Sequence, residues 1–453
     1  MLFQGAPAIY RSGKDVPVDR VSQCMTRTRV ARHRRIGVLL LSFPLVAAAC
    51  GSAAVDNAEQ SSSTPVTQTD SSESDRTPSE SSDRASGAGE PIRLDQIESS
   101  PTDVTASGLA IFRGEQVDGA PEPLVDLEEI RSGGPPPDGI PSIDDPSFVP
   151  AAAVDFLEEN EPVLALDIDG DQRAYPVQIL MWHEIVNDTV GDVPVAITYC
   201  PLCNSAVAYD RRIDDQVLEF GTSGLLWNSA LVMYDRQTET LWSHFTGEGI
   251  VGELTGTEID TFPVATVPWG VWRDANPDGL VLSRDTGFDR AYGRNPYPGY
   301  DDVTSEPFLY EGEVDGRYTA MTRIVGVEVG GEALGVPLFV LQDSGLVSVE
   351  VGGTDLVMFW MPGTASALDA ADVAGGDDIG ATGVFVPVVD GQTLTFTATD
   401  GGFVDAETGS RWNLLGQAID GPLDGEALDA VEHVDTFWFA WSAFRPDSAV
   451  VES

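Results

Sequence analysis

Residues 193–210, VPVAITYCPLCNSAVAYD, are the part of the sequence that decides the fold of this chain. Apolar and β-branched residues flank Cys200 and Cys203 on both sides and predict two strands, over 193–199 and 205–210. Few residues separate these strands, so the cysteines are expected in a tight turn between them. The pattern predicts a β-rich α+β fold of mainly antiparallel strands.

A short helix is expected just before these strands, within residues 175–188. This segment places two polar residues, His183 and Glu184, inside an otherwise apolar run. A histidine near a thiol can accept its proton, or can stabilise the thiolate as an imidazolium. The alternative is that His183 is a hydrogen-bonded histidine of the core. The sequence alone leaves both interpretations open.

Two later segments, 242–277 and 412–446, match at a nearly constant offset. The matched pairs are Trp242 with Trp412, Gly252 with Gly421, Gly256 with Gly425, Trp269 with Trp438, Trp272 with Trp441 and Pro277 with Pro446. We interpret these tryptophans and glycines as core and turn residues. The matches predict a tandem internal duplication of a mainly antiparallel β unit, packed as one pseudo-symmetric body. The first repeat is expected at 92–310 and the second at 311–453.

The upstream parts of the two repeats align more loosely. Residues 193–195 resemble 336–338, and residues 217–220 resemble 393–396. In this alignment residues 340–344 replace the cysteine motif, and the second repeat has no counterpart of His183-Glu184. A cysteine pair present in only one copy is not needed to fold the unit, which favours a functional role.

The chain has four cysteines, Cys24, Cys50, Cys200 and Cys203. A lone C-x-x-C in an exported protein is a redox dithiol, part of a metal site or a structural disulfide. A disulfide across two residues closes almost no loop and therefore adds little stability. We expect a cofactor-free thiol–disulfide centre, and a thiol–disulfide oxidoreductase as the corresponding enzyme. Cys200 would attack and Cys203 would resolve the mixed disulfide, with His183 as proton acceptor and Glu184 as its orienting or electrostatic neighbour.

Two other functions fit the same residues. In the first, one zinc or copper ion is held by Cys200, Cys203 and His183, with His244 or a carboxylate as the fourth ligand. In the second, the protein is a non-catalytic binding module whose tryptophan-rich segments form the binding surface. The sequence names no substrate for any of these functions.

The N-terminal region predicts export and lipidation. Five arginines within 27–35 precede an apolar run over 36–49, which ends in Ala47-Ala48-Ala49 before Cys50. We interpret 25–49 as a lipoprotein signal peptide and 1–24 as preceding the true start. Residues 50–91 are expected to form a disordered acidic Ser/Thr-rich tether. The protein would be extracytoplasmic, anchored to the bacterial cell membrane through lipidated Cys50.

The charge balance restricts the possible partners. The chain has 25 basic and 73 acidic residues, a net charge of −48. Nucleic-acid binding needs a basic face, so no nucleic-acid partner is expected. Lys14 is the only lysine, which excludes a lysine nucleophile in the folded part. The expected partners are the membrane, through the lipid anchor, and a protein or small-molecule thiol or disulfide.

The combined motifs resemble the bacterial domain-of-unknown-function 3179 family. They are WHEIVND at 182–188, TYCPLC at 198–203, GGPPPDGIP at 133–141, MYDR at 233–236 and FWFAW at 437–441. The likeness runs from about Leu94 to Val451. It implies an exported protein, and redox chemistry, because some members have selenocysteine in place of one of these cysteines. This chain departs from the pattern at Asn204, where glycine is expected, and at Pro137, where lysine is expected.

Overall fold

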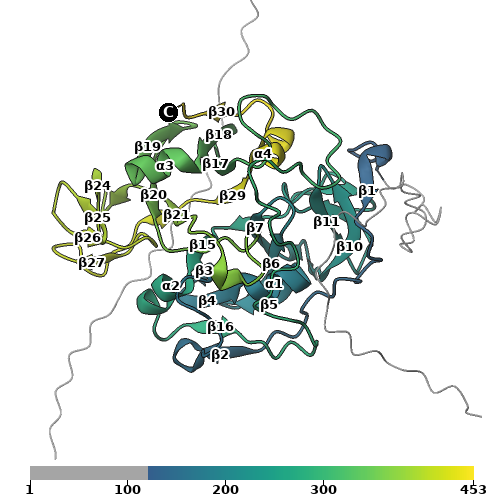
Figure 1. Cartoon of the computed structure of the whole chain (residues 1–453), viewed down its shortest axis with the longest axis horizontal. Helices are drawn as coiled ribbons and strands as arrows, with labels where there is room; N and C mark the ends of the chain where they lie inside the picture. The colour runs from purple at the N-terminus through teal and green to yellow at the C-terminus, as the bar shows by residue number, and fades with distance from the viewer. Residues whose placement is uncertain (1–120, 453) are drawn as a thin grey trace, which may run out of the picture. The chain divides into compact units, whose positions relative to one another are not determined.

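The structure is a computed structural model that describes residues 121–452 (Figure 1). All of these residues lie in one unit, which runs from Ser82 to Ser453. The predictions for the start, the signal peptide, the tether and Cys50 concern residues outside the described range. Between residues 121 and 452, no helix is both long enough and apolar enough to cross a membrane.

The first half of the described chain contains one complete set of hairpins and short helices. It opens with η4 (Leu127–Glu129), β1 (Ile130–Ser132), β2 (Phe148–Pro150) and η5 (Ala151–Ala153). The set itself is β3 (Pro162–Ile168), β4 (Asp171–Pro176), α1 (Val177–His183), β5 (Ile185–Val190), β6 (Val193–Cys200), β7 (Ser205–Asp210), β8 (Arg212–Ile213), β9 (Gln216–Val217), β10 (Phe220–Trp227), β11 (Ala230–Asp235), β12 (Leu241–Ser243), β13 (Gly249–Val251), β14 (Thr261–Phe262), β15 (Ala265–Pro268), α2 (Trp269–Ala275) and β16 (Leu280–Leu282).

The second half contains the same kinds of element in the same order. They are β17 (Arg323–Val329), β18 (Glu332–Pro337), α3 (Leu338–Ser344), β19 (Leu346–Val351), β20 (Thr354–Met361), η6 (Val373–Gly375), β21 (Ala381–Val386), β22 (Val388–Val389), β23 (Gln392–Thr393), β24 (Phe396–Thr399), β25 (Gly402–Asp405), β26 (Arg411–Trp412), β27 (Ala418–Asp420), β28 (Asp429–Ala430), β29 (His433–Phe437), α4 (Trp438–Phe444) and β30 (Ala449–Val450). Apart from η6, each has a counterpart in the first half.

The sheets of the two halves also correspond. The order β15-β3-β4-β16 in the first half matches β29-β17-β18-β30 in the second. In the same way β14-β7-β6-β5 matches β28-β21-β20-β19, and β10-β11-β12-β13 matches β24-β25-β26-β27. Both halves even share one parallel pairing, β4 with β16 and β18 with β30. The β-rich, mainly antiparallel class is confirmed, and the shared topology is what a tandem duplication predicts.

One buried hydrogen-bond motif recurs in both halves. Asp235 accepts from Trp242 Nε1 at 2.9 Å, and Asp405 accepts from Trp412 Nε1 at 3.0 Å. Each carboxylate also accepts from a threonine three residues before the start of the strand that carries the tryptophan, Thr238 in one half and Thr408 in the other. These matching contacts explain why the pair Trp242 and Trp412 was visible in the sequence.

The two halves pack against each other in a reciprocal way. Strand β29 of the second half contacts β7 of the first, and β15 of the first half contacts β21 of the second. Because β15 corresponds to β29 and β7 to β21, these two contacts are equivalent, as a pseudo-two-fold axis between the halves requires. Two of the hydrophobic clusters contain residues from both halves. In Figure 1, β10–β11 and β24–β27 lie on opposite sides of this shared interior.

The structure confirms the local predictions around the cysteines and corrects the upstream alignment. Strands β6 and β7 and the helix α1 lie where they were expected. Residues 336–338, however, correspond to Tyr175-Pro176-Val177 and not to 193–195, because both segments end a hairpin strand with proline and begin a seven-residue helix. His183-Glu184 therefore does have a structural counterpart, Ser344-Gly345.

The repeat tryptophans form the interior. Trp242, Trp269, Trp272, Trp412, Trp438 and Trp441 are all buried. Their interpretation as core residues is confirmed. They do not supply the exposed aromatic surface that the binding-module hypothesis requires.

Candidate functional site

The Cys-x-x-Cys motif forms the turn between two neighbouring strands. Cys200 ends β6, and its register partner Ser205 begins β7. Asn204, the last residue of the turn, has a φ of +51°, a conformation that glycine adopts freely and asparagine tolerates better than most residues. Its side chain accepts a hydrogen bond from the Tyr199 hydroxyl at 3.2 Å. Asparagine therefore fits the position where the resemblance led us to expect glycine.

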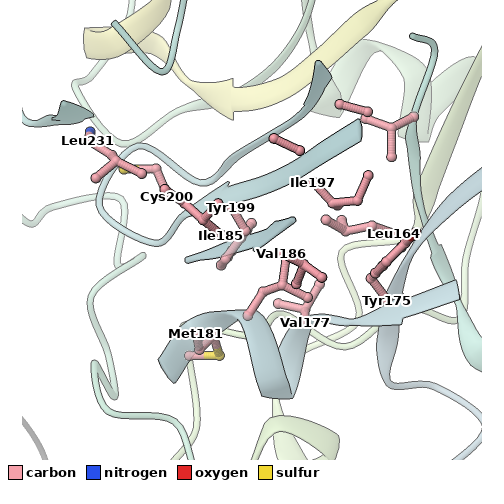
Figure 2. Close-up of a cluster of buried hydrophobic side chains, with 14 of the residues drawn as sticks. Leu164, Tyr175, Val177, Met181, Ile185, Val186, Ile197, Tyr199, Cys200 and Leu231 are labelled. Atoms are coloured by element: carbon pink, nitrogen blue, oxygen red, sulfur yellow. Dashed lines mark hydrogen bonds between the residues drawn. The ribbon is translucent and has the colours of Figure 1, made fainter. Parts of the chain in front are cut away.

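Both cysteine sulfurs are buried, and they form no disulfide. Cys200 is 2% exposed and Cys203 is 0% exposed. The backbone N–H of Leu231 donates to Cys200 Sγ at 3.4 Å. Figure 2 shows this arrangement, with Cys200 at the end of the strand that carries Ile197 and Tyr199, and the Leu231 nitrogen beside its sulfur. In this conformation, neither sulfur is open to a folded protein partner.

The surroundings give the two thiols different acidities. Burial raises the pKa of Cys200, but hydrogen bonds from the Cys203 thiol and from the backbone N–H groups of Cys203, Leu231 and Leu202 outweigh it, so the net pKa is lowered. Burial, together with the adjacent Cys200 sulfur, raises the pKa of Cys203 well above its ordinary value. Cys200 is therefore the better thiolate of the pair, and Cys203 remains the protonated thiol.

A short polar relay begins at Cys203. Its sulfur shares a hydrogen bond with Ser205 Oγ at 3.0 Å, and Ser205 Oγ shares one with His244 Nε2 at 2.8 Å. His244 is fully buried, and burial lowers its pKa to about 4, so its ring is neutral at neutral pH. In the part of the chain that the structure describes, its Nδ1 has no partner. The relay offers the Cys203 proton a path of two hydrogen bonds to a neutral imidazole.

Glu184 lies near Cys200. It is the C-terminal capping residue of α1, with a φ of +59° and an exposed fraction of 8%. Burial raises the pKa of its carboxyl well above the ordinary value, and the neighbouring Cys200 thiolate raises it further. The raised pKa favours the protonated form of the Glu184 carboxyl beside Cys200. Positive φ in a non-glycine residue costs energy and often accompanies function.

His183 lies in a different network. Its Nδ1 contacts the Pro141 carbonyl oxygen at 2.7 Å, and its Nε2 contacts the Tyr292 hydroxyl at 2.6 Å. Both ring nitrogens are thus occupied, and burial lowers the pKa of His183 to about 4. Across residues 121–452, no hydrogen bond joins His183 to either sulfur. These contacts are those of a hydrogen-bonded core histidine, the alternative that the sequence left open.

Three hydrogen bonds from later segments of the chain hold the cysteine turn in place. The Cys203 carbonyl oxygen accepts hydrogen bonds from Thr436 Oγ1 at 2.7 Å and from the Phe437 N–H at 3.2 Å, both on β29. The Leu202 carbonyl oxygen accepts from the Tyr300 hydroxyl at 2.9 Å. These contacts fix the turn, so that the sulfurs are positioned before any partner arrives.

The predicted metal ligands do not form one cluster. Within the described residues, no group of three or more His, Cys, Asp or Glu side chains is placed to hold a metal ion. Of the four candidates, Cys200, Cys203 and His244 lie along one path, but Ser205 stands between His244 and Cys203. His183 belongs to the network described above. A zinc or copper site would need Ser205 to move aside.

A family model described as "Protein of unknown function (DUF3179)" matches residues 137–448 of this chain. The chain belongs to the DUF3179 family. The matched range contains both cysteines, Ser205, His244 and Glu184, so the family resemblance drawn from the motifs is confirmed. No curated protein and no solved structure matches the chain.

The two halves of this DUF3179 protein differ at the thiol centre. Equivalent elements place Met361 where the first half has Cys200, and Ala381 where it has Ser205. The positions of His244 and Glu184 are taken by Leu414 and Gly345. The second half thus has the same scaffold without any of these polar groups.

The sequence of this DUF3179 protein did not lead us to predict a relay through Ser205 and His244. Ser205 stands only two residues after Cys203, which was a usable signal. His244 follows β12, far along the chain, and reaches the cysteines only because the β10–β13 sheet packs beside β7. In a correct alignment His244 corresponds to Leu414 of the second half, which is also buried. A histidine in one repeat and a leucine in the other is the feature that would have drawn attention to His244.

Proposed function

We propose that this protein is a thiol–disulfide redox protein that acts through Cys200 and Cys203. The observation that carries the proposal is the comparison of the two halves. One scaffold occurs twice, and the thiols, Ser205, His244 and Glu184 occur together in one copy only. Because the other copy folds with Met361, Ala381, Leu414 and Gly345 at these places, the polar set is not required by the fold.

The arrangement supports a two-step exchange. In the first step the Cys200 thiolate attacks one sulfur of a partner disulfide, a mixed disulfide forms, and the other partner sulfur leaves with its electron pair. In the second step Cys203 attacks the Cys200 sulfur and releases the second partner thiolate. The partner gains two electrons, and the protein is left with a Cys200–Cys203 disulfide. The reverse sequence oxidises a partner dithiol.

Each proton in this exchange has a nearby acceptor or donor. The Cys203 proton leaves along Ser205 toward His244, and Glu184 donates its proton to the first departing thiolate. A thiol leaves more readily when it is protonated as it departs. This assignment gives the role of proton acceptor to His244, acting through Ser205, in place of the role predicted for His183.

We propose in addition that the protein is exported and anchored to the bacterial cell membrane through lipidated Cys50. The support is the arginine-rich segment followed by an apolar run and three alanines before Cys50. A thiol–disulfide centre suits this location, since disulfides persist in oxidising compartments.

The proposed function is tested by a redox titration of the full chain carrying Cys24→Ser and Cys50→Ser. The protein is equilibrated in buffers of mixed reduced and oxidised dithiothreitol, and free thiols are then trapped under denaturing conditions and counted by mass. We expect one two-electron transition that disappears in both Cys200→Ser and Cys203→Ser, at a potential above about −300 mV, as for labile disulfides. A pair that never forms a disulfide in any buffer would contradict the proposal.

A further inference from the structure

An apolar cavity of about 220 Å³ adjoins the thiol centre. Two of its wall residues are tied directly to the cysteines. Leu202 lies between Cys200 and Cys203 in the sequence, and the backbone of Leu231 donates the hydrogen bond to Cys200 Sγ. The cavity therefore borders the backbone that stabilises the Cys200 thiolate.

Two buried polar groups of the cavity wall have no protein partner. Glu184 is 8% exposed and Tyr297 is 6% exposed, and both line the cavity. Among residues 121–452, the Glu184 carboxyl and the Tyr297 hydroxyl form no hydrogen bond with another residue, and neither belongs to the side-chain atoms that are completely shielded from solvent. Their hydrogen-bonding capacity is therefore open to a molecule in the cavity. A molecule inside the cavity would complete these bonds, and the Glu184 and Tyr297 groups lie near each other and near Cys200.

We propose that this cavity binds the substrate of the thiol centre, and that the substrate is a small, uncharged organic disulfide. The inference rests on the proposed function and adds the substrate class. An apolar cavity of about 150 Å³ holds benzene, so this cavity has room for a molecule modestly larger than that. Both sulfurs are buried, which excludes a folded protein's disulfide in this conformation. The apolar walls, formed in part by Leu202, Leu231 and Phe308, disfavour a charged molecule.

The chemistry balances with the groups that are present. The Cys200 thiolate attacks the substrate disulfide, whose sulfur–sulfur bond breaks, and the departing thiolate takes the proton of Glu184. Cys203 then attacks the Cys200 sulfur, and the second substrate thiolate takes the proton that Cys203 has released along Ser205. Two neutral thiols leave, the protein gains its internal disulfide, and the negative charge of Cys200 ends on Glu184.

The test uses the full chain with Cys24→Ser, Cys50→Ser and Cys203→Ser, so that the adduct at Cys200 is trapped. Three disulfides of similar length serve as probes: bis(2-hydroxyethyl) disulfide, which is neutral, cystamine, which is cationic, and 3,3′-dithiodipropionate, which is anionic. Adduct formation is followed by intact mass. We expect the neutral probe to react at least about ten-fold faster than either charged probe, because a charge is costly to desolvate.

A pair of matched variants tests the cavity itself. Ile140→Trp fills the cavity that Leu202 and Leu231 line, whereas Leu415→Trp fills a cavity of about 240 Å³ that is lined by residues of both halves. We expect Ile140→Trp to slow the neutral probe at least about ten-fold by steric exclusion, and Leu415→Trp to leave its rate unchanged. Unfolding midpoints of both variants show that each remains folded.

Two outcomes overturn the inference in distinguishable ways. If the three probes react equally, or if Ile140→Trp reacts like the parent while the redox titration still gives a Cys200–Cys203 disulfide, the cavity is not the substrate site and the proposed function stands. If no probe reacts and the titration gives no disulfide, both the proposed function and the substrate class are wrong.

Discussion

Glu184→Gly should make the protein more stable and less reactive. Glu184 has a φ of +59°, and Gly345 has a φ of +74° at the equivalent helix end. Relief of the positive φ is worth about 1–2 kcal/mol, and removal of a buried, unpartnered carboxyl about 1–3 kcal/mol. Loss of two methylenes costs about 1.6 kcal/mol, and the added freedom of glycine in the unfolded chain about 0.5–1 kcal/mol. The expected net gain in the free energy of unfolding is about 1 kcal/mol.

The assay is urea unfolding of the full chain followed by fluorescence of its nine tryptophans. We expect a higher midpoint with an unchanged slope, together with slower formation of the mixed disulfide. The matched control is Gly345→Glu, which places glutamate at the same backbone position without a neighbouring thiol. A Cβ at Gly345 would lie 2.7 Å from the Ala398 Cβ, so we expect a loss of at least about 1 kcal/mol. If Glu184→Gly lowers the free energy of unfolding by more than 1 kcal/mol, Glu184 has a structural role and the reasoning fails.

Three further predictions follow from the contacts of the centre and of the recurring motif. The folded-state pKa of Glu184 is raised above its ordinary value of 4.5, so its contribution to the free energy of unfolding is full below pH 4.5 and is lost as the pH rises. Glu184→Gln should therefore make the free energy of unfolding depend less on pH above this value. An unchanged pH dependence would show that Glu184 is ionised in the folded protein. The Ser205 hydrogen bond lowers the pKa of Cys203, so Ser205→Ala should slow the second step and let the mixed disulfide accumulate in quenched-flow mass spectra, whereas a parent-like time course would exclude the relay. Asp235→Ala and Asp405→Ala each remove the hydrogen-bond acceptor of a buried tryptophan and should each lower the free energy of unfolding by about 1–3 kcal/mol, measured by thermal unfolding. A large difference between the two variants would argue against equivalent roles.

The sequence predicted the elements whose causes are local. Alternating and β-branched residues on both sides of the cysteines predicted β6 and β7, and the spacing left room only for a turn. The tryptophan pairs gave the correct register for the later part of the repeat, and in one of these pairs the indoles of Trp242 and Trp412 donate to equivalent buried aspartates. These inferences needed no knowledge of which segments meet in space.

The sequence could not settle what depends on packing between distant segments. Val-Pro occurs at 193–194 and again at 336–337, and short motifs alone aligned these two segments, although the second corresponds to the hairpin end before α1. His183 was closer in sequence to Cys200 than His244, yet His244 is the histidine in the relay. Sequence distance is a poor guide here, because β12 and β7 belong to different sheets and only the packing of these sheets brings His244 to Ser205.

The most direct test of the thiol centre is a thiol count with elemental analysis on one sample. The full chain with Cys24→Ser and Cys50→Ser is purified without added metal, and its thiols are counted under denaturing conditions after mild oxidation and again after mild reduction. We predict no thiols after oxidation, two after reduction, and no bound metal. About one equivalent of zinc or copper that protects both thiols from oxidation would contradict the redox function and assign Cys200 and Cys203 to a metal site.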